Sequence, residues 1–141
     1  MAQKAERASL VVAYWHEYVT RHVQCDKIEA DRWFWAWEAV DAIVHDVPEE
    51  ALWLTVELAE YCVSAQALAY LGAGPVEDLV KTADDALFAR ILKAARKRPR
   101  FRRALATIWI HDETRIRALK LLFRECPPEL PAGVLEDARG P

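Results

Sequence analysis

The sequence lacks asparagine altogether and has few glycines. Only four glycines occur in 141 residues, whereas alanine, leucine, arginine and glutamate are abundant. Tight β-hairpin turns depend on pairs such as Asn-Gly and Asp-Gly, so this composition is poorly suited to a β fold. We therefore expect an all-α protein, and a chain of this length is expected to form one domain.

Long apolar runs are missing as well. No stretch of about 18 apolar residues occurs, and the first apolar segment is interrupted by His16, Glu17 and Arg21. The sequence therefore predicts neither a membrane-spanning helix nor a signal peptide. We expect a soluble, cytoplasmic protein with no membrane partner.

Motifs for disulfides, nucleophilic catalysis and phosphate binding are absent. Cysteines are three in number and far apart, so reduced thiols are expected. Neither Ser9 nor Ser64 lies in a Gly-x-Ser-x-Gly motif, and no phosphate-binding glycine loop occurs. His22 and Cys25 lack a second pair at zinc spacing, and His45 stands at a predicted helix boundary. These absences favour a non-catalytic protein without a cofactor.

What is present is apolar periodicity between clear start and stop signals. The expected helices span roughly residues 4–22, 27–45, 47–63, 65–71, 75–81 and 83–97, with two more from 99 and from 113. Predicted N-caps are Asp26, Asp46, Ser64, Thr82 and Asp112. A proline-rich sequence follows Cys126 and cannot continue a helix. We expect a helical domain over 1–126 and an extended tail over 127–141.

Several of these helices have distinctive apolar faces. The first is expected to bury Val12, Trp15, Val19 and Val23. The helices over 27–45 and 47–63 are apolar on two sides, which is usual for a helix packed between layers. The expected fold has seven or eight helices in two layers, as an irregular bundle or a HEAT-like stack.

Gly72 and Gly74 separate two of the predicted helices. A glycine directly after Leu71 can adopt the left-handed conformation that closes a helix. Pro75 suits the first turn of the next helix, where no backbone N–H is needed. The sequence therefore predicts a tight corner between two helices at this point.

Charge is unevenly distributed along the chain. Residues 26–85 contain 14 acidic and 3 basic residues, a net charge of −11. Residues 90–124 contain 12 basic and 2 acidic residues, a net charge of +10. The sequence leaves open whether these two halves pair with each other in the fold.

Two acid pairs are candidates for a metal site. Glu38 with Asp41, and Glu57 with Glu60, are each spaced three apart, so both members of a pair project from one side of a helix. Two such helices side by side could hold Mg²⁺, as in all-helical nucleotide pyrophosphatases, although those enzymes have the Glu-x-x-Glu pair first. A Mg²⁺-dependent phosphohydrolase is one hypothesis, and a plain acidic face is the alternative.

Aromatic residues accompany these acids, off the inward stripes. Tryptophan beside carboxylates suits the binding of a basic protein, since the ring supplies affinity and the charge supplies steering. The leading hypothesis is a non-catalytic immunity-type or regulatory protein that binds a basic partner, such as a toxin nuclease. Its predicted face consists of Phe34, Trp35, Glu38, Asp41, Trp53, Glu57 and Glu60. Alternatively, another helix covers the aromatics, or Trp35 and Leu54 are covered in a homo-oligomer.

A basic segment follows in the second half of the chain. Residues 90–103 include eight basic residues and no acidic ones. The segment could bind a nucleic-acid backbone. The candidates are Arg96, Lys97, Arg98, Arg100, Arg102 and Arg103. It lacks interleaved exposed aromatics, because Phe101 is better placed in the core, so pairing with the acidic helices is the alternative.

Three motifs point to a family: Trp37-Glu38, residues 71–79 (Leu-Gly-Ala-Gly-Pro-Val-Glu-Asp-Leu) and residues 99–105 (Pro-Arg-Phe-Arg-Arg-Ala-Leu). Over roughly residues 33–109 the chain resembles an uncharacterised family of small bacterial proteins, a domain of unknown function. Its members carry a Leu-x-Ala-Gly-Pro-Leu-Glu-Asp-Leu core followed by an Arg-x-Pro-x-Phe-Arg segment, and Val76 here replaces the usual leucine. The resemblance implies a helical domain and a bacterial source, and it supplies no catalytic residues.

Overall fold

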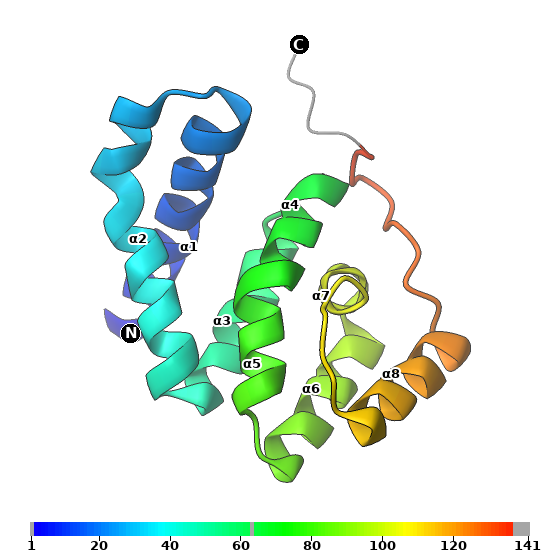
Figure 1. Ribbon diagram of the computed structural model, residues 1–141. Coiled ribbons are helices and arrows are strands. Elements are labelled where there is room, and N and C mark those ends of the chain that lie inside the picture. Colours follow the sequence, from blue (N-terminus) through cyan, green and yellow to red (C-terminus); the bar gives the residue numbers. More distant parts are fainter. Residues whose placement is uncertain (1, 63, 137–141) are drawn as a thin grey trace.

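Helices form most of the described chain, which comprises residues 2–62 and 64–136 of a computed structural model (Figure 1). In order, these are α1 (Ala2–Tyr18), the π-helix η1 (Val19–Val23), α2 (Lys27–Asp46), α3 (Pro48–Glu60), α4 (Ala65–Leu71), the π-helix η2 (Gly72–Val76), α5 (Glu77–Thr82), α6 (Asp85–Lys97), α7 (Pro99–Leu105) and α8 (Glu113–Glu125). The described residues include an isolated bridge between Ser64 and Leu135 but no strand. The predicted all-α bundle is confirmed.

The helices pack around a continuous central helical segment that consists of α4, η2 and α5 (Figure 1). α1 and α2 lie side by side at one edge of the bundle, and α4, η2 and α5 run end to end through its middle (Figure 1). α7 lies inside and contacts α3, α4, α6 and η2. Of the helices described, none combines the length and the apolar character needed to cross a lipid bilayer.

α3 is buried on both of its apolar sides, as its sequence predicts. Leu52, Leu54 and Leu58 are each at most 2% exposed. The Trp15 indole of α1 donates a hydrogen bond of 3.0 Å to the Leu58 carbonyl, which joins α1 to α3. Because Leu54 is covered within the chain, it gives no reason for self-association.

The predicted buried stripe of α1 is wrong in part. Val12, Val19 and Val23 are exposed, at 48%, 37% and 37%. The buried side chains of this region include Val11, Tyr14, Trp15 and Tyr18. Two apolar lines run along α1, and the line with the large aromatic rings is buried because it removes more apolar surface from water.

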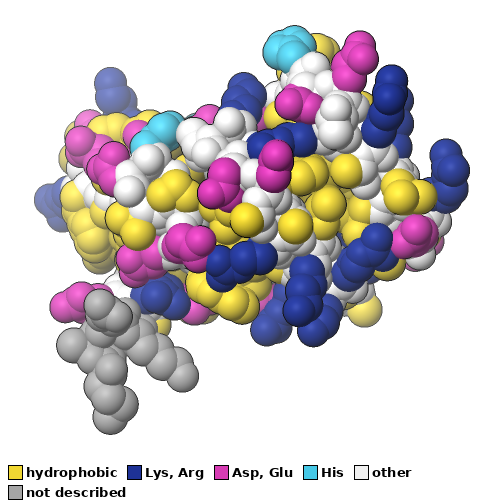
Figure 2. Space-filling model, turned by 90° about the horizontal axis from the view of Figure 1, so that it is seen from below, with side chains coloured by type: hydrophobic (Ala, Val, Ile, Leu, Met, Phe, Trp, Pro, Cys, Tyr) yellow, Lys and Arg dark blue, Asp and Glu magenta, His cyan; other side chains and the backbone are white. Residues whose placement is uncertain are grey.

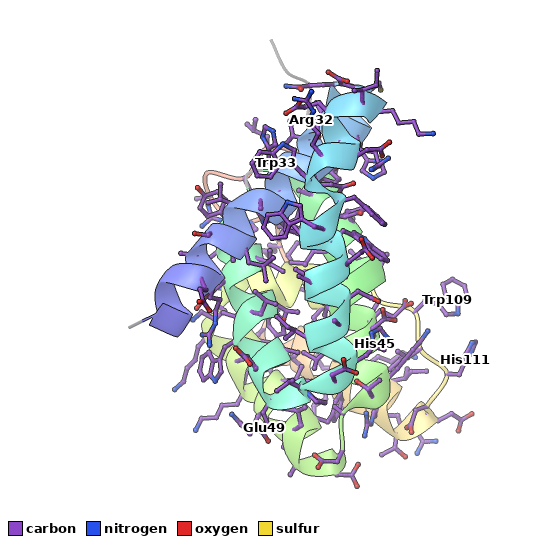
Figure 3. The ribbon with its side chains drawn as sticks, turned by 90° about the vertical axis from the view of Figure 1, so that its left-hand side faces the viewer. Arg32, Trp33, His45, Glu49, Trp109 and His111 are labelled. Atoms are coloured by element: carbon purple, nitrogen blue, oxygen red, sulfur yellow. The ribbon has the colours of Figure 1, made fainter. Side chains whose placement is uncertain are left out.

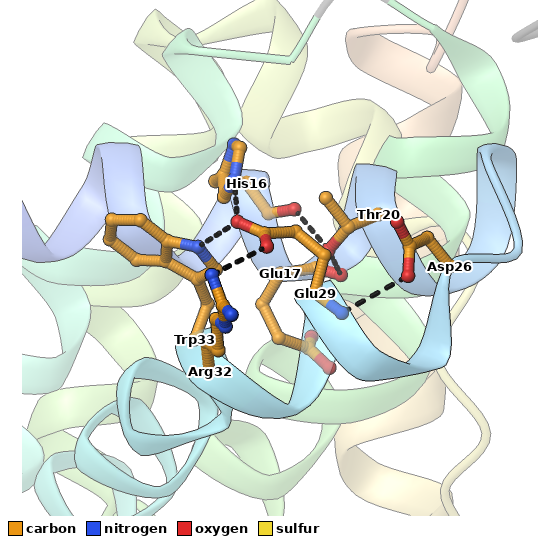
Figure 4. Close-up of polar contacts among 7 residues, drawn as sticks. All are labelled: His16, Glu17, Thr20, Asp26, Glu29, Arg32 and Trp33. Carbon is orange, nitrogen blue, oxygen red and sulfur yellow. Dashed lines mark hydrogen bonds and ion pairs between the residues drawn. The ribbon is translucent and has the colours of Figure 1, made fainter.

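A polar network fixes the start of α2 against α1 (Figure 4). The Asp26 side chain caps α2 as predicted, accepting a hydrogen bond of 3.1 Å from the Glu29 backbone N–H. The Glu29 carboxylate accepts hydrogen bonds from the Trp33 indole at 3.1 Å and from Arg32 at 3.4 Å. His16 of α1 lies 3.8 Å from the same carboxylate.

Other predicted helix starts are confirmed or corrected. Asp46 does not cap α3, because α2 continues through it and Val47 precedes α3 without a side-chain cap. Thr82 ends α5, and Asp84 caps α6 in its place. The N-caps that form as predicted include Ser64 and Asp112.

The predicted corner at Gly72 and Gly74 is wrong. Gly72 has a φ of −62°, in the right-handed helical region, and the helical path continues through η2 into α5. Gly72 is required for a different reason. A Cβ at this position would overlap with the Thr107 hydroxyl and the Ala104 carbonyl, so only glycine lets α7 approach this closely.

Replacing Gly72 by alanine is expected to lower the free energy of unfolding by about 1–3 kcal/mol, the usual cost of overpacking. Gly74→Ala is the matched control, because a Cβ there meets no heavy atom within 4 Å apart from those of its chain neighbours. Urea unfolding followed by circular dichroism measures both variants. Equal stability of the two would contradict the close approach.

The part of the extended tail that the structure describes, residues 127–136, lies along α7, and residues 137–141 lie outside the described chain. Arg102 and Arg103 donate hydrogen bonds of 3.3 and 2.9 Å to the carbonyls of the two prolines that begin it. Val134 is buried at 8% exposure. The Leu135 carbonyl accepts a hydrogen bond of 2.6 Å from the Ala65 backbone N–H, while the Leu135 side chain is 60% exposed. The described part of the tail is therefore attached by the buried Val134, by the partly buried Leu130 and by backbone polar groups.

Candidate functional site

The aromatic residues of the predicted partner-binding face are exposed, but they have different surroundings. Phe34, 39% exposed, stacks on Trp37 with ring centroids 5.3 Å apart. Trp35, 51% exposed, lies 6.4 Å from the ring of Trp33. Trp53, 48% exposed, lines a groove between α3 and α6. The structure therefore does not gather them on one acidic surface.

Two acids of that face are paired with arginines from other helices. Glu57 lies 3.5 Å from Arg7 of α1. Glu60 lies 3.9 Å from Arg100 of α7. The acidic and basic halves of the chain thus meet in the fold, and both carboxylates are partly neutralised.

The predicted Mg²⁺ ligands do not converge. Glu38 is exposed, and Asp41 lies beside His45, with 3.4 Å between Asp41 Oδ1 and His45 Nδ1. In the described part of the chain, no three of the four predicted carboxylates place an oxygen within 4.8 Å of one another. A Mg²⁺ site built from Glu38, Asp41, Glu57 and Glu60 is not what the structure shows.

Some cations of the basic segment are bonded within the fold, whereas for others the described chain shows no ion pair. Arg96 forms an ion pair of 2.7 Å with Glu125, and Arg100 lies beside an acid of α3. Arg102 and Arg103 are bonded to backbone carbonyls. Within the described residues, the structure shows no ion pair for Lys93, Lys97 and Arg98.

A pocket of about 280 Å³ opens between α1, α2, α4, η2 and α5. Its walls include three aromatic rings, from Tyr14, Trp37 and Tyr70, and two carboxylates, from Asp41 and Asp78. The remaining lining residues are Val40, Ala73, Gly74 and Pro75. The pocket thus combines an apolar, aromatic interior with two acidic groups.

His45 stands beside the two carboxylates of this pocket. Its Nδ1 donates a hydrogen bond of 2.8 Å to the Asp41 backbone carbonyl, and its Nε2 lies 3.9 Å from Asp78 Oδ2. The backbone hydrogen bond, followed by the nearby carboxylates, raises the pKa of His45 above its usual value. Burial raises the pKa of Asp78, because desolvation disfavours its anion.

Tyr14 brings an unsatisfied polar atom to the pocket. The residue is 1% exposed, and its hydroxyl has no hydrogen-bond partner in the described chain. An unsatisfied buried polar group costs about 1–3 kcal/mol. Burial raises the pKa of both Tyr14 and Tyr70, so both hydroxyls stay neutral at physiological pH.

Asp41, His45 and Asp78 also form a possible metal-ligand set. Each offers one ligand atom, and these atoms lie within 4.8 Å of one another. One imidazole and two carboxylates suit Zn²⁺, Mn²⁺ or Fe²⁺ better than Mg²⁺. The hydrogen bond of Nδ1 to a backbone carbonyl leaves Nε2 free as the ligand atom, as is usual for a metal-bound histidine. The same carboxylates can instead bind an organic cation.

Sequence reasoning missed most of this pocket. Asp41 and His45 are four apart on α2, and that spacing alone indicates neighbouring side chains. Tyr70 and Asp78 lie in the two helices that the predicted corner would separate, and no sequence pattern predicts the π-helix between them.

Comparison with known families gives a match over most of the chain. A family model described as "Family of unknown function (DUF6869)" matches residues 23–125. The chain belongs to this family. In this DUF6869 member the matched range includes residues 33–109, where the sequence motifs lie, and all pocket residues except Tyr14. No curated protein and no solved structure matches the chain.

His45 is expected to make stability depend on pH. Its raised pKa means that the folded protein binds this proton more tightly than the unfolded chain does. The contribution of protonated His45 to the free energy of unfolding is therefore present below the ordinary pKa of about 6.5. It is lost as pH rises through the raised pKa of the folded protein. As pH rises from about 6 to about 8, the melting temperature of His45→Gln should fall less than that of the wild type. Thermal unfolding measures both proteins.

His111→Gln is the control for this measurement. His111 is exposed, and the described residues show no ion pair for it. Its side chain points away from the protein, whereas His45 lies close against the helices (Figure 3). A pH dependence that is the same in His45→Gln as in the wild type would contradict the assigned interaction.

Proposed function

We propose that this chain is a non-catalytic protein-binding module that holds a cationic side chain of a basic partner in the pocket between α2 and α5. The observation that carries this proposal is that three aromatic rings and two carboxylates line one cavity. Aromatic rings attract cations through their electron-rich faces, and tryptophan does so most strongly. An ammonium or guanidinium group is the ligand that suits both the rings and the acids.

The state of Asp78 supports a cationic ligand. Burial disfavours the charged form of this carboxylate and raises its pKa. A cation in the pocket would offset that cost by placing an opposite charge beside the anion. His45 provides only a weak internal substitute, because its Nε2 is 3.9 Å from Asp78, beyond hydrogen-bond distance.

The size and surroundings of the pocket support a side chain of a larger partner. Its volume of about 280 Å³ is near the lower end of pockets for drug-sized ligands, about 300 Å³. Phe34 stacks on the pocket residue Trp37 and is itself 39% exposed, so an apolar surface adjoins the opening. A partner could insert one cationic side chain and cover this surface with apolar residues.

An immunity-type or regulatory role in the bacterial cytoplasm is the finer form of the proposal. The two carboxylates of the pocket support it, because local negative charge steers a basic partner, such as a toxin nuclease, toward the pocket. The bacterial source and a HEAT-like arrangement of the helices belong to the same proposal. They rest on the resemblance of the core motif and on the two-sided burial of α3.

NMR titration with short peptides tests the proposal. Each peptide carries one arginine or one lysine in a glycine-serine background. The indole signal of Trp37 should shift on binding, and that of Trp109, which lies outside the pocket, should not. Binding of an isolated side chain is expected to be weak, with a Kd of about 1 mM or more. Peptides with citrulline or acetyl-lysine, which keep the shape but lose the charge, should leave the Trp37 signal in place.

Asp78→Asn should weaken peptide binding about tenfold, since interactions with a charged partner are worth about 1.5–3 kcal/mol. Glu38→Gln, which removes an acid from α2 outside the pocket lining, is the control and should change little. Affinity should rise with pH, because the ligand competes with protons on His45 and Asp78, whose pKa values are raised. Equal losses in both variants, or no Trp37 shift with any cationic peptide, would overturn the proposal.

A further inference from the structure

A second hollow, of opposite charge, lies between α3 and α6. It has a volume of about 390 Å³. Leu52 and Val56 are buried and supply apolar contacts, while Trp53 is 48% exposed. The remaining lining residues are Arg90, Lys93, Ala94, Lys97 and Arg98. The basic segment alone offers no exposed aromatic ring, but α3 places one beside it.

The cations of this groove include the residues of the basic segment for which the described chain shows no ion pair. Arg90 is paired with Glu49 at the protein surface. Lys93, Lys97 and Arg98 are exposed, and the structure shows no ion pair for them in the described chain. Three cationic groups are therefore available to an incoming anion.

We propose that this groove binds single-stranded nucleic acid, with a base stacked on Trp53 and backbone phosphates bound by the cations of α6. A positively charged groove with an exposed aromatic ring is the arrangement that single-strand binding uses. Lys93 and Lys97 are one helical turn apart, so their attachment points repeat about 6 Å apart along the groove. A regular spacing of cations suits a ligand with regularly spaced phosphates.

The apolar lining distinguishes this ligand from other anions. A space-filling view shows hydrophobic side chains at the surface of one face, with Lys and Arg as well as Asp and Glu side chains around them (Figure 2). The indole and the apolar lining offer a face on which a flat nucleobase can stack, and every nucleotide carries such a base. A duplex is disfavoured because its bases are stacked on one another and present no free face to Trp53.

Fluorescence anisotropy with a labelled oligothymidylate at low salt tests the inference, with the corresponding duplex as comparison. Trp53→Ala should weaken single-strand binding about tenfold, and Trp53→Phe, which keeps an aromatic ring, should retain most of the affinity. Trp109→Ala is the matched control, because Trp109 is 74% exposed and lies outside this groove. Circular dichroism checks that each variant is folded, as expected for substitutions at exposed side chains.

The salt dependence tests the cations separately. For single strands, log K falls with log salt by about 0.7 per neutralised phosphate. Lys93→Gln and Lys97→Gln should each reduce this slope by about that amount, whereas Lys120→Gln on α8, exposed and outside the groove, should not. The inference is overturned by no binding at low salt, by equal affinity for the duplex, or by binding that Trp53→Ala leaves unchanged. Asp78→Asn plays no part in these outcomes, so the two proposals stand or fall separately.

Discussion

The close approach of α7 to the π-helix η2 is the constraint on which the arrangement of the bundle depends. Phe101, Ala104 and Leu105 of α7 are fully buried, and α7 contacts α3, α4, α6 and η2. Gly72 permits this contact because it has no side chain to overlap with α7. Other η2 residues line the pocket, and η2 leads into α5, which carries Asp78. The packing that builds the core thus also sets the position of the candidate site.

Features governed by local chemistry could be predicted from the sequence. The N-caps Asp26, Ser64 and Asp112 form because a side-chain oxygen meets a backbone N–H three residues later, whatever the rest of the chain does. Gly72 was misinterpreted because a left-handed helix end and a close helix contact both call for glycine. The choice between two apolar lines on α1, which decided that Val12 is exposed, depends on tertiary packing that the sequence does not display.

The candidate sites were less predictable than the helices, since each combines side chains from different elements. The sequence left open whether Trp53 is exposed or covered by another helix, and in the fold it is 48% exposed. It was placed beside acids because Glu57 and Glu60 follow it on α3, whereas in the fold these pair with arginines and Trp53 faces the basic α6. Similarly, Asp78 reaches the α2 residue His45 only because η2 carries the helix onward without a corner. Helix-to-helix pairing of this kind has no short-range signature.

The proline-rich tail provides hydrogen-bond acceptors for two arginine side chains of α7. Proline has no N–H, so the start of the tail offers only acceptors, and a guanidinium group offers only donors. Arg102 and Arg103 are therefore occupied by an internal ligand, the carbonyls of Pro127 and Pro128. While residues 127–136 remain docked, each guanidinium group has a donor bonded to a tail carbonyl, and Arg102 is bonded as well to the carbonyls of Ala95 and Arg96.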